Sequence, residues 1–163
     1  MAKKNERLYL LIQTICSTGI RVSELKYITK EAILARGTAI RCKGKVRYVI
    51  LTDELCKILK SYSDSQNIKS GPIFITKSGQ PLDRSNIWTQ MKRLCEKSGV
   101  PSKKVYPHNL RHLFARTYYD AQKDIVKLAD ILGHSNLNTT RIYTLESGEE
   151  HRKQLQGLGL LDE

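Results

Sequence analysis

The sequence lacks the features that mark membrane, secreted, disulfide-rich and zinc-binding proteins. No apolar run approaches the roughly 20 residues of a membrane-spanning helix. Four charged residues lie within the first seven positions, where a signal peptide would need an apolar region. The four cysteines are scattered without a CxxC pair, which indicates reduced, buried thiols and neither a disulfide set nor a zinc site. We therefore expect a cytoplasmic protein with no membrane partner.

Other signatures of cofactor chemistry are also missing. The sequence contains no Walker-type phosphate loop, no carboxylate cluster and no Cys/His ligand set. It has no internal repeat, low-complexity tract or long linker, and 163 residues suit one domain with a core. Acidic residues are scarce: 16 face 28 basic ones, which gives a net charge of +12. This excess indicates a polyanionic partner, with nucleic acid favoured over a membrane surface.

Apolar periodicity predicts an α+β, mainly α-helical domain with one small, three-stranded antiparallel sheet. The expected helices cover 5–17, 21–25, a segment capped by Thr52, a segment from Asp83 or Ser85 to 97, then 107–120, 123–132 and 147–157. Between 29 and 51 the period changes, and we expect strands at 33–34, 38–42 and 46–51, with turns at Gly37 and Gly44. The helix from 83 to 97 is expected to turn four apolar residues to the core, namely Ile87, Trp88, Met91 and Leu94.

The stretch from 132 to 143 places a histidine at a corner between two helices and a tyrosine nine residues later. Gly133 ends an apolar helical run, and Ser135 and Asn136 can cap a new short helix that carries Tyr143. A phenol, with a pKa of about 10, is a poor nucleophile near neutral pH. It becomes useful where cations and hydrogen-bond donors surround the group that it attacks. A reactive Tyr143 therefore requires such groups from other parts of the chain.

The first candidate cation is Arg21, which follows a break at Thr18–Gly19. At the start of a short helix its guanidinium can point outward as an anion clamp. Glu24, three residues on, is within reach to orient it. The alternative reading is an ordinary surface ion pair.

The turn at Gly44 is flanked by basic residues on both sides. On each side of the turn two cations stand two positions apart and share one strand face; they are Arg41, Lys43, Lys45 and Arg47. Such a turn is suited to lie along a phosphate backbone or enter the minor groove. The alternative is a solvated edge made basic to discourage aggregation.

His108, Arg111 and His112 share one helix face, at positions i, i+3 and i+4. Two histidines at this spacing also occur in zinc proteases, but Asn109 stands where such an enzyme carries glutamate, and no third ligand is evident nearby. We therefore expect no metal here. His112 is expected to pack or to orient a neighbour and not to act as a catalyst.

Each signal is weak alone, but their order and combination are specific. The motifs Thr18-Gly-Ile-Arg-Val-Ser-Glu-Leu25, the Lys43-Gly44 hairpin ending in Arg47-Tyr-Val-Ile-Leu51, His108-Asn-Leu-Arg-His112, and Leu132-Gly-His134 with Ile142-Tyr143 resemble the tyrosine recombinase (phage integrase) family. The resemblance spans nearly the whole chain. It implies the catalytic fold of that family and cleavage and rejoining of DNA strands through a 3′-phosphotyrosyl intermediate. The implied reaction needs no metal, nucleotide or other cofactor, which agrees with the absence of a phosphate loop, a carboxylate cluster and a Cys/His ligand set.

The resemblance also implies a role for each motif residue. Tyr143 would be the nucleophile, Arg21 and Arg111 would clamp the non-bridging oxygens, and His134 would donate a further hydrogen bond there. His108 would position or deprotonate the tyrosine, Lys43 would protonate the leaving 5′-oxygen, and Glu24 would support Arg21. DNA contacts are expected from Arg41, Lys45, Arg47 and the connector residues Lys103 and Lys104. The hairpin is one residue tighter than the common family pattern, which leaves Lys45 as a rival to Lys43.

At the level of the whole chain, the resemblance implies one catalytic domain over 1–163, with a C-terminal tail at 147–163. We expect the core-binding domain that usually precedes it in the family to be absent from this chain. The expected partners are double-stranded DNA and further protomers in a tetrameric synapse, with a monomer in isolation. The implied source is a bacterium, phage or mobile element. Two alternatives stay open: relaxation of DNA in the manner of a type IB topoisomerase, and a non-catalytic DNA-binding domain.

Overall fold

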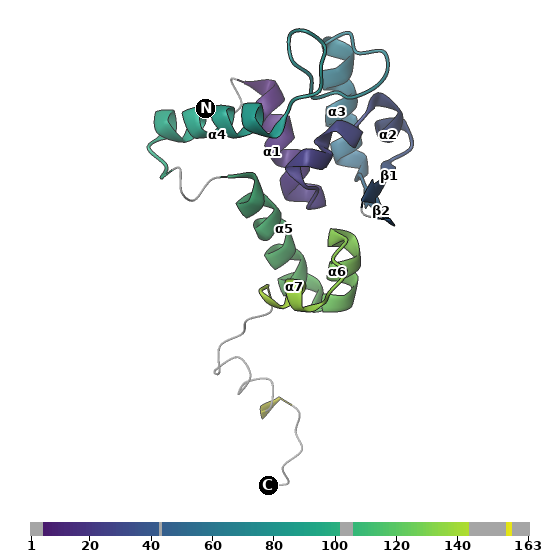
Figure 1. The fold of residues 1–163 in the computed structure, drawn as a ribbon, viewed down its shortest axis with the longest axis vertical. Coiled ribbons are helices and arrows are strands. Elements are labelled where there is room, and N and C mark those ends of the chain that lie inside the picture. Colours follow the sequence, from purple (N-terminus) through teal and green to yellow (C-terminus); the bar gives the residue numbers. More distant parts are fainter. Residues whose placement is uncertain (1–4, 43, 102–105, 144–155, 158–163) are drawn as a thin grey trace.

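The computed structural model of the protein describes residues 5–42, 44–101, 106–143 and 156–157. Within these ranges the fold is mainly helical, with a two-stranded antiparallel sheet (Figure 1). The elements in chain order are α1 (Glu6–Thr18), the 3-10 helix η2 (Val22–Tyr27), α2 (Lys30–Leu34), β1 (Gly37–Cys42), β2 (Lys45–Ile50), α3 (Asp53–Ser65), α4 (Arg84–Ser98), α5 (Pro107–Gln122), α6 (Ile125–Leu132) and α7 (Asn138–Arg141). No helix in these ranges is long and apolar enough to cross a membrane.

Several helix starts follow capping signals that the sequence shows. Thr52 accepts a hydrogen bond from the Leu55 amide at 3.3 Å and begins α3. Asp83 accepts one from the Asn86 amide at 2.7 Å and begins α4, which decides between the two predicted starts. Pro107 occupies the first turn of α5, where its missing N–H costs nothing. The predicted helices that fall within the described residues therefore exist close to their expected bounds.

The sheet differs from the prediction, because the segment expected as its first strand is helical. Residues 33 and 34 lie at the end of α2. Thr29 accepts a hydrogen bond from the Ala32 amide at 3.0 Å and Glu31 stands in the first turn, so local capping outweighs the strand preference of Ile33. The two remaining strands pair from Gly37 opposite Ile50 to Cys42 opposite Lys45.

The described residues form two apolar clusters that meet near the end of α1. The larger one joins α1, η2, α2, the sheet, α3 and α4 around fully buried side chains such as Leu11, Ile15 and Leu59. The smaller one lies between α5 and α6, around Ala115 and Leu132. In Figure 1, α6 lies beside α5; α6 also contacts α7, and α5 packs against α1. This arrangement brings the end of α1, the start of α5 and the end of α6 together.

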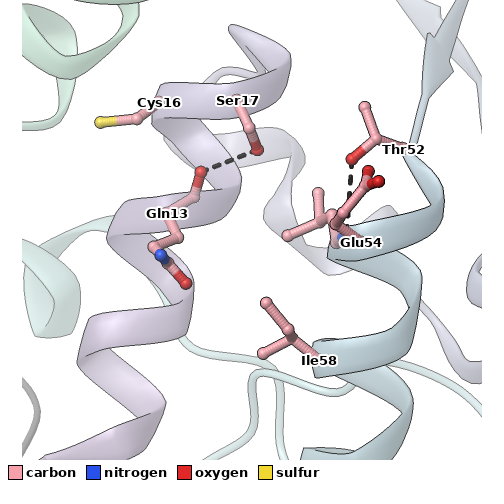
Figure 2. A pocket seen from close by; sticks show the side chains of 7 residues that line it. Gln13, Cys16, Ser17, Thr52, Glu54 and Ile58 are labelled. Carbon is pink, nitrogen blue, oxygen red and sulfur yellow. Dashed lines mark hydrogen bonds between the residues drawn. The ribbon is translucent and has the colours of Figure 1, made fainter.

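A separate hollow of about 320 Å³ lies between α1 and α3 (Figure 2). Its lining is largely apolar and includes Leu55 and Ile58. Burial raises the pKa of the Cys16 thiol at its edge, so this thiol stays protonated at neutral pH. The described residues contain no cluster of three or more potential metal ligands, here or elsewhere. A group of charged side chains that are buried or partly buried lies instead where the two apolar clusters meet; it comprises Arg21, Glu24, Arg47 and Arg111.

Candidate active site

Gly19 determines how α1 and α5 approach each other. It ends α1 in the left-handed conformation with φ +62°, and a Cβ at this position would lie 2.4 Å from Cδ1 of Phe114 on α5. The carbonyl of Gly19 accepts a hydrogen bond from Nη1 of Arg111. One glycine therefore ends the helix, allows the close approach of α5 and seats the guanidinium of Arg111, while the chain continues into Arg21.

Glu24 is the partner of two arginines. Its Oε1 accepts a hydrogen bond from Nη1 of Arg21 at 2.9 Å, which is the predicted i+3 contact. Its Oε2 accepts one from the backbone amide of Arg21 at 2.9 Å and also pairs with Nη2 of Arg47. Burial alone raises the pKa of Glu24, but the Arg21 amide and the charges of Arg47 and Arg21 outweigh it, so the net pKa is lowered. The carboxylate is therefore ionised and holds both guanidinium groups.

The position of Arg47 corrects the expectation that it faces DNA from the hairpin. Only 9% of its side chain is exposed, and its Nη1 donates to the Ile131 carbonyl at 2.7 Å. The reason lies in the register: Arg47 stands opposite the buried Ile40, on the inward face of the sheet. Arg41 stands opposite Val46. Because successive side chains of a strand point to opposite faces of the sheet, Arg41 and Val46 lie on the other face, where both are exposed. Arg47 links β2 to η2 and α6.

Arg111 is the most enclosed cation of the site, at 4% exposure. Its Nη2 donates to the Leu132 carbonyl at 2.7 Å and reaches Nε2 of His134 at 3.2 Å. Burial, followed by the charges of Arg21 and Arg47, lowers its pKa to about 10, so it remains charged at neutral pH. The same causes, burial first and then three arginines, lower the pKa of His134 to about 4. In the free protein His134 is therefore neutral.

Arg21, His108 and Arg111 line one cleft of about 420 Å³. The cleft also contains Arg84 and Trp88 from α4, and neither is among the site residues predicted from the sequence. The prediction that Trp88 lies in the core is wrong, since its exposed fraction is 50%. The buried face of α4 is formed by Ile87, Met91 and Cys95, and Trp88 lies on the neighbouring face of the helix. The spacing of Arg84, Trp88 and Lys92 could have indicated this exposed face, because residues four positions apart share one side of a helix. The Lys92 ammonium lies 5.0 Å from the Trp88 ring centroid.

Tyr143 lies two residues beyond the end of α7, not within a helix as predicted. Its ring meets that of His112 edge-on, with centroids 5.0 Å apart, and Nε2 of His112 lies 2.7 Å from Nε2 of His108. Burial raises the pKa of Tyr143, and the charge of Arg111 opposes this effect. Tyr143 lines a neighbouring hollow of about 450 Å³ together with His112 and Arg116. Tyr143 and Arg21 therefore line neighbouring hollows, and the paired side chains of His108 and His112 lie between them.

Some predicted residues lie outside the described part of the chain. These are Lys43, Lys103 and Lys104, along with nearly all of the predicted helix 147–157. The backbone of Lys45 belongs to β2. The described part of the site therefore consists of Arg21, Glu24, His108, Arg111, His134 and Tyr143, with Arg47 as an inward partner.

Comparisons with known proteins agree with this geometry. The model of the phage integrase family matches residues 1–150. The chain is 39% identical over 141 residues to the tyrosine recombinase XerH of Campylobacter jejuni, an alignment that covers 83% of this chain and 40% of that protein. The chain spans about half the length of the curated relatives that it matches.

Solved structures show the same fold. The crystal structure of XerA recombinase matches with a TM-score of 0.78 and 29% identity, over 99% of this chain and 61% of that one. XerH bound to its difH substrate in a pre-cleavage complex matches with a TM-score of 0.72 and 30% identity, over 93% of this chain and 46% of that one. The motifs found in the sequence, their convergence in space and these matches lead to one conclusion: the chain belongs to the phage integrase family, together with the tyrosine recombinases.

Proposed function

We propose that this chain is the catalytic domain of a site-specific DNA recombinase, which cleaves and rejoins DNA strands through a 3′-phosphotyrosyl intermediate. One observation carries the proposal. Arg21, His108 and Arg111 line a single cleft, and Arg111 also reaches His134. Tyr143 lies next to this set, in ring contact with His112. This is the collection of cations and donors that a phenol needs in order to attack a phosphodiester.

The arginines supply the electrostatic part of the proposed reaction. Arg21 is held by Glu24, and Arg111 by the Gly19 and Leu132 carbonyls, so both guanidinium groups are oriented before a phosphate arrives. Groups fixed in this way stabilise developing charge on the non-bridging oxygens without reorganising during the reaction. The burial of Arg111 strengthens this effect, since charges interact more strongly away from water.

Proton transfer is the second part of the proposed reaction. The raised pKa of Tyr143 means that the phenol must lose its proton during the attack. His108 contacts His112, whose ring in turn contacts Tyr143. We assign to His108 the positioning or deprotonation of Tyr143. We assign protonation of the leaving 5′-oxygen to Lys43. The phosphotyrosyl bond conserves the energy of the cleaved phosphodiester, so rejoining needs no nucleotide.

The proposed substrate is double-stranded DNA. Support comes from the net charge of +12 and from the DNA-bound XerH structure. We further propose that residues 1–163 form one catalytic domain, that a core-binding domain acts with it, and that four protomers assemble on nucleoid DNA in the cytoplasm. Strand exchange is favoured over topoisomerase-like relaxation because the curated relatives are named recombinases.

Covalent capture on a suicide substrate tests the proposal. A nicked duplex loses a short 5′ fragment after cleavage, so the attached protein cannot rejoin the strand. We expect the wild type to form a band that survives denaturation, and Tyr143→Phe to bind DNA equally well without forming it. Tyr48→Phe, which alters an exposed tyrosine on β2, is the matched control and should keep the band. A covalent band from Tyr143→Phe would remove Tyr143 as the nucleophile, and no band from the wild type would leave only a DNA-binding domain.

A further inference from the structure

Thr140 connects two residues of the candidate site. It lies in α7 and its side chain is fully buried. The Thr140 hydroxyl oxygen is 2.9 Å from Nδ1 of His134. Its backbone carbonyl accepts the amide N–H of Tyr143 at 3.0 Å. One buried residue therefore contacts the imidazole with its side chain and the tyrosine with its backbone.

The partners of His134 decide which of its nitrogens carries the proton. The guanidinium of Arg111 has only N–H donors, so Nε2 of His134 must accept the hydrogen bond from Nη2 of Arg111. The proton of the neutral ring is then on Nδ1, and Nδ1–H donates to the Thr140 hydroxyl. Since both ring nitrogens are engaged, neither ring orientation nor tautomer is free to change.

We propose that Thr140 is a positioning residue, which holds His134 in the Nδ1–H tautomer with Nε2 turned toward Arg111 and keeps this ring in register with Tyr143. The inference rests on the proposed function for its catalytic consequence. When a phosphodiester takes the N–H of Arg111, Nε2 is left without a donor and can take a proton from solvent. The imidazolium then donates Nε2–H to a phosphate oxygen while Nδ1–H stays on Thr140, so the ring need not turn over.

The position of Thr140 also explains why a buried polar side chain is present in α7. Arg111, Arg21 and Arg47 all face His134 and act against its protonation. Without the Thr140 hydroxyl, the Nδ1–H that the bond from Arg111 requires would have no acceptor, and the free-energy cost of leaving it unpaired would favour the other tautomer, so both would be populated. A hydroxyl accepts Nδ1–H in the free and in the phosphate-bound state alike. Groups that orient a metal-ligating imidazole typically contribute about 10–100-fold to metal affinity or activity, and we expect an effect of the same order for His134.

Two substitutions of Thr140 separate its hydroxyl from its packing. Thr140→Val keeps the shape and the backbone carbonyl and removes the hydroxyl, whereas Thr140→Ser keeps the hydroxyl. On the suicide duplex we expect Thr140→Val to reduce the rate of covalent capture by about 10–100-fold with unchanged DNA affinity. Thr140→Ser should restore most of that rate. A role in packing alone predicts the opposite order, because serine leaves the larger gap.

Long-range ¹H–¹⁵N NMR of the free chain gives a readout that does not depend on cleavage. We expect the Nδ1–H tautomer for His134 in the wild type and in Thr140→Ser, and a mixture of tautomers in Thr140→Val. An Nε2–H tautomer in the wild type would overturn the inference even if Thr140→Val failed to fold. An unchanged tautomer together with an unchanged capture rate in Thr140→Val would also overturn the inference. If the wild type forms no covalent band, the proposed function fails, while the NMR comparison still decides the role of Thr140.

Discussion

Arg47 and Glu24 form an ion pair in which both side chains are less than a tenth exposed, at 9% and 7%. The two residues are 23 positions apart and join β2 to η2. The same carboxylate orients Arg21, and the same guanidinium reaches the Ile131 carbonyl at the end of α6. This pair therefore ties the proposed phosphate clamp to the segment that leads to His134 and Tyr143.

Replacing Glu24 by glutamine should destabilise the protein strongly. The substitution keeps the shape of the side chain but leaves the charge of Arg47 buried without a counter-ion. Removing one partner of a buried pair typically costs about 3–5 kcal/mol, and we expect the lower end because an acceptor oxygen remains. Urea unfolding measures the change. Asp53→Asn is the control, since its pair with Arg36 is exposed at 70% and 71% and should contribute little. Similar losses for both variants would contradict the assigned burial.

The stability difference between the wild type and Glu24→Gln should shrink in acid. The pKa of Glu24 is lowered in the folded state, so its contribution is complete above the unfolded value of about 4.3 and is lost as pH falls through the folded value. Asp64 also has a lowered pKa, held by its partner Lys30, but it is present in both proteins and cancels in the difference. Unfolding of both proteins across the acid range tests this. A difference that stays constant into strong acid would mean that the charge of Glu24 contributes nothing.

Gly133 should tolerate alanine much less well than Gly99. Both glycines end a helix in the left-handed conformation, with φ +65° and +66°, so alanine meets the same backbone strain of about 1 kcal/mol in each. Only at Gly133 would the new Cβ clash, at 2.3 Å from Cδ of Arg47, whose guanidinium is fixed by Glu24. We expect Gly133→Ala to lose about 1–3 kcal/mol more than Gly99→Ala in thermal unfolding. Equal losses would show that Arg47 moves aside freely.

Local contacts of this fold are readable from the sequence, and long-range ones are not. Thr52 and Asp83 act within one helical turn, so their capping role was predictable, as was the reach of Glu24 to Arg21. The direction of Arg47 depends on its register opposite Ile40 and on packing against α6. Charge alone therefore placed it wrongly on the exposed edge.

The candidate site shows the same division. Its motifs identify the family by their order, but the hydrogen bond from Arg111 to Gly19 joins residues 92 positions apart. The role of Gly19 depends on the packing of α1 against α5, and that of Thr140 on the bond from Arg111 on α5 to Nε2 of His134. Neither residue type indicates chemistry by itself, because threonine and glycine occur at many ordinary helix ends. The apolar spacing of Ile87, Trp88, Met91 and Leu94 predicts Trp88 on the core face, whereas the buried residues of α4 are Ile87, Met91 and Cys95.

The last prediction concerns which lysine of the hairpin protonates the leaving oxygen, and it rests on the proposed function. The 5′-oxygen leaves as an alkoxide, which is a very poor leaving group unless it is protonated. A sulfur at that bridging position leaves as a thiolate, whose parent thiol has a pKa near 8.5, and needs little proton donation. If Lys43 is the acid, Lys43→Ala should cleave normal DNA about 10²–10⁴-fold more slowly and recover most of that loss on a 5′-bridging phosphorothiolate duplex.

Two further variants give this experiment its contrast. Arg111→Lys should not recover on the sulfur substrate, because Arg111 acts on the non-bridging oxygens and its guanidinium is fixed by two carbonyls. Lys45→Ala should bind DNA more weakly and show no sulfur-specific rescue. Rescue of Lys45→Ala instead of Lys43→Ala would move the general acid to position 45. Rescue of neither lysine variant would mean that the hairpin contributes binding alone, and the proton would then have to come from elsewhere in the cleft.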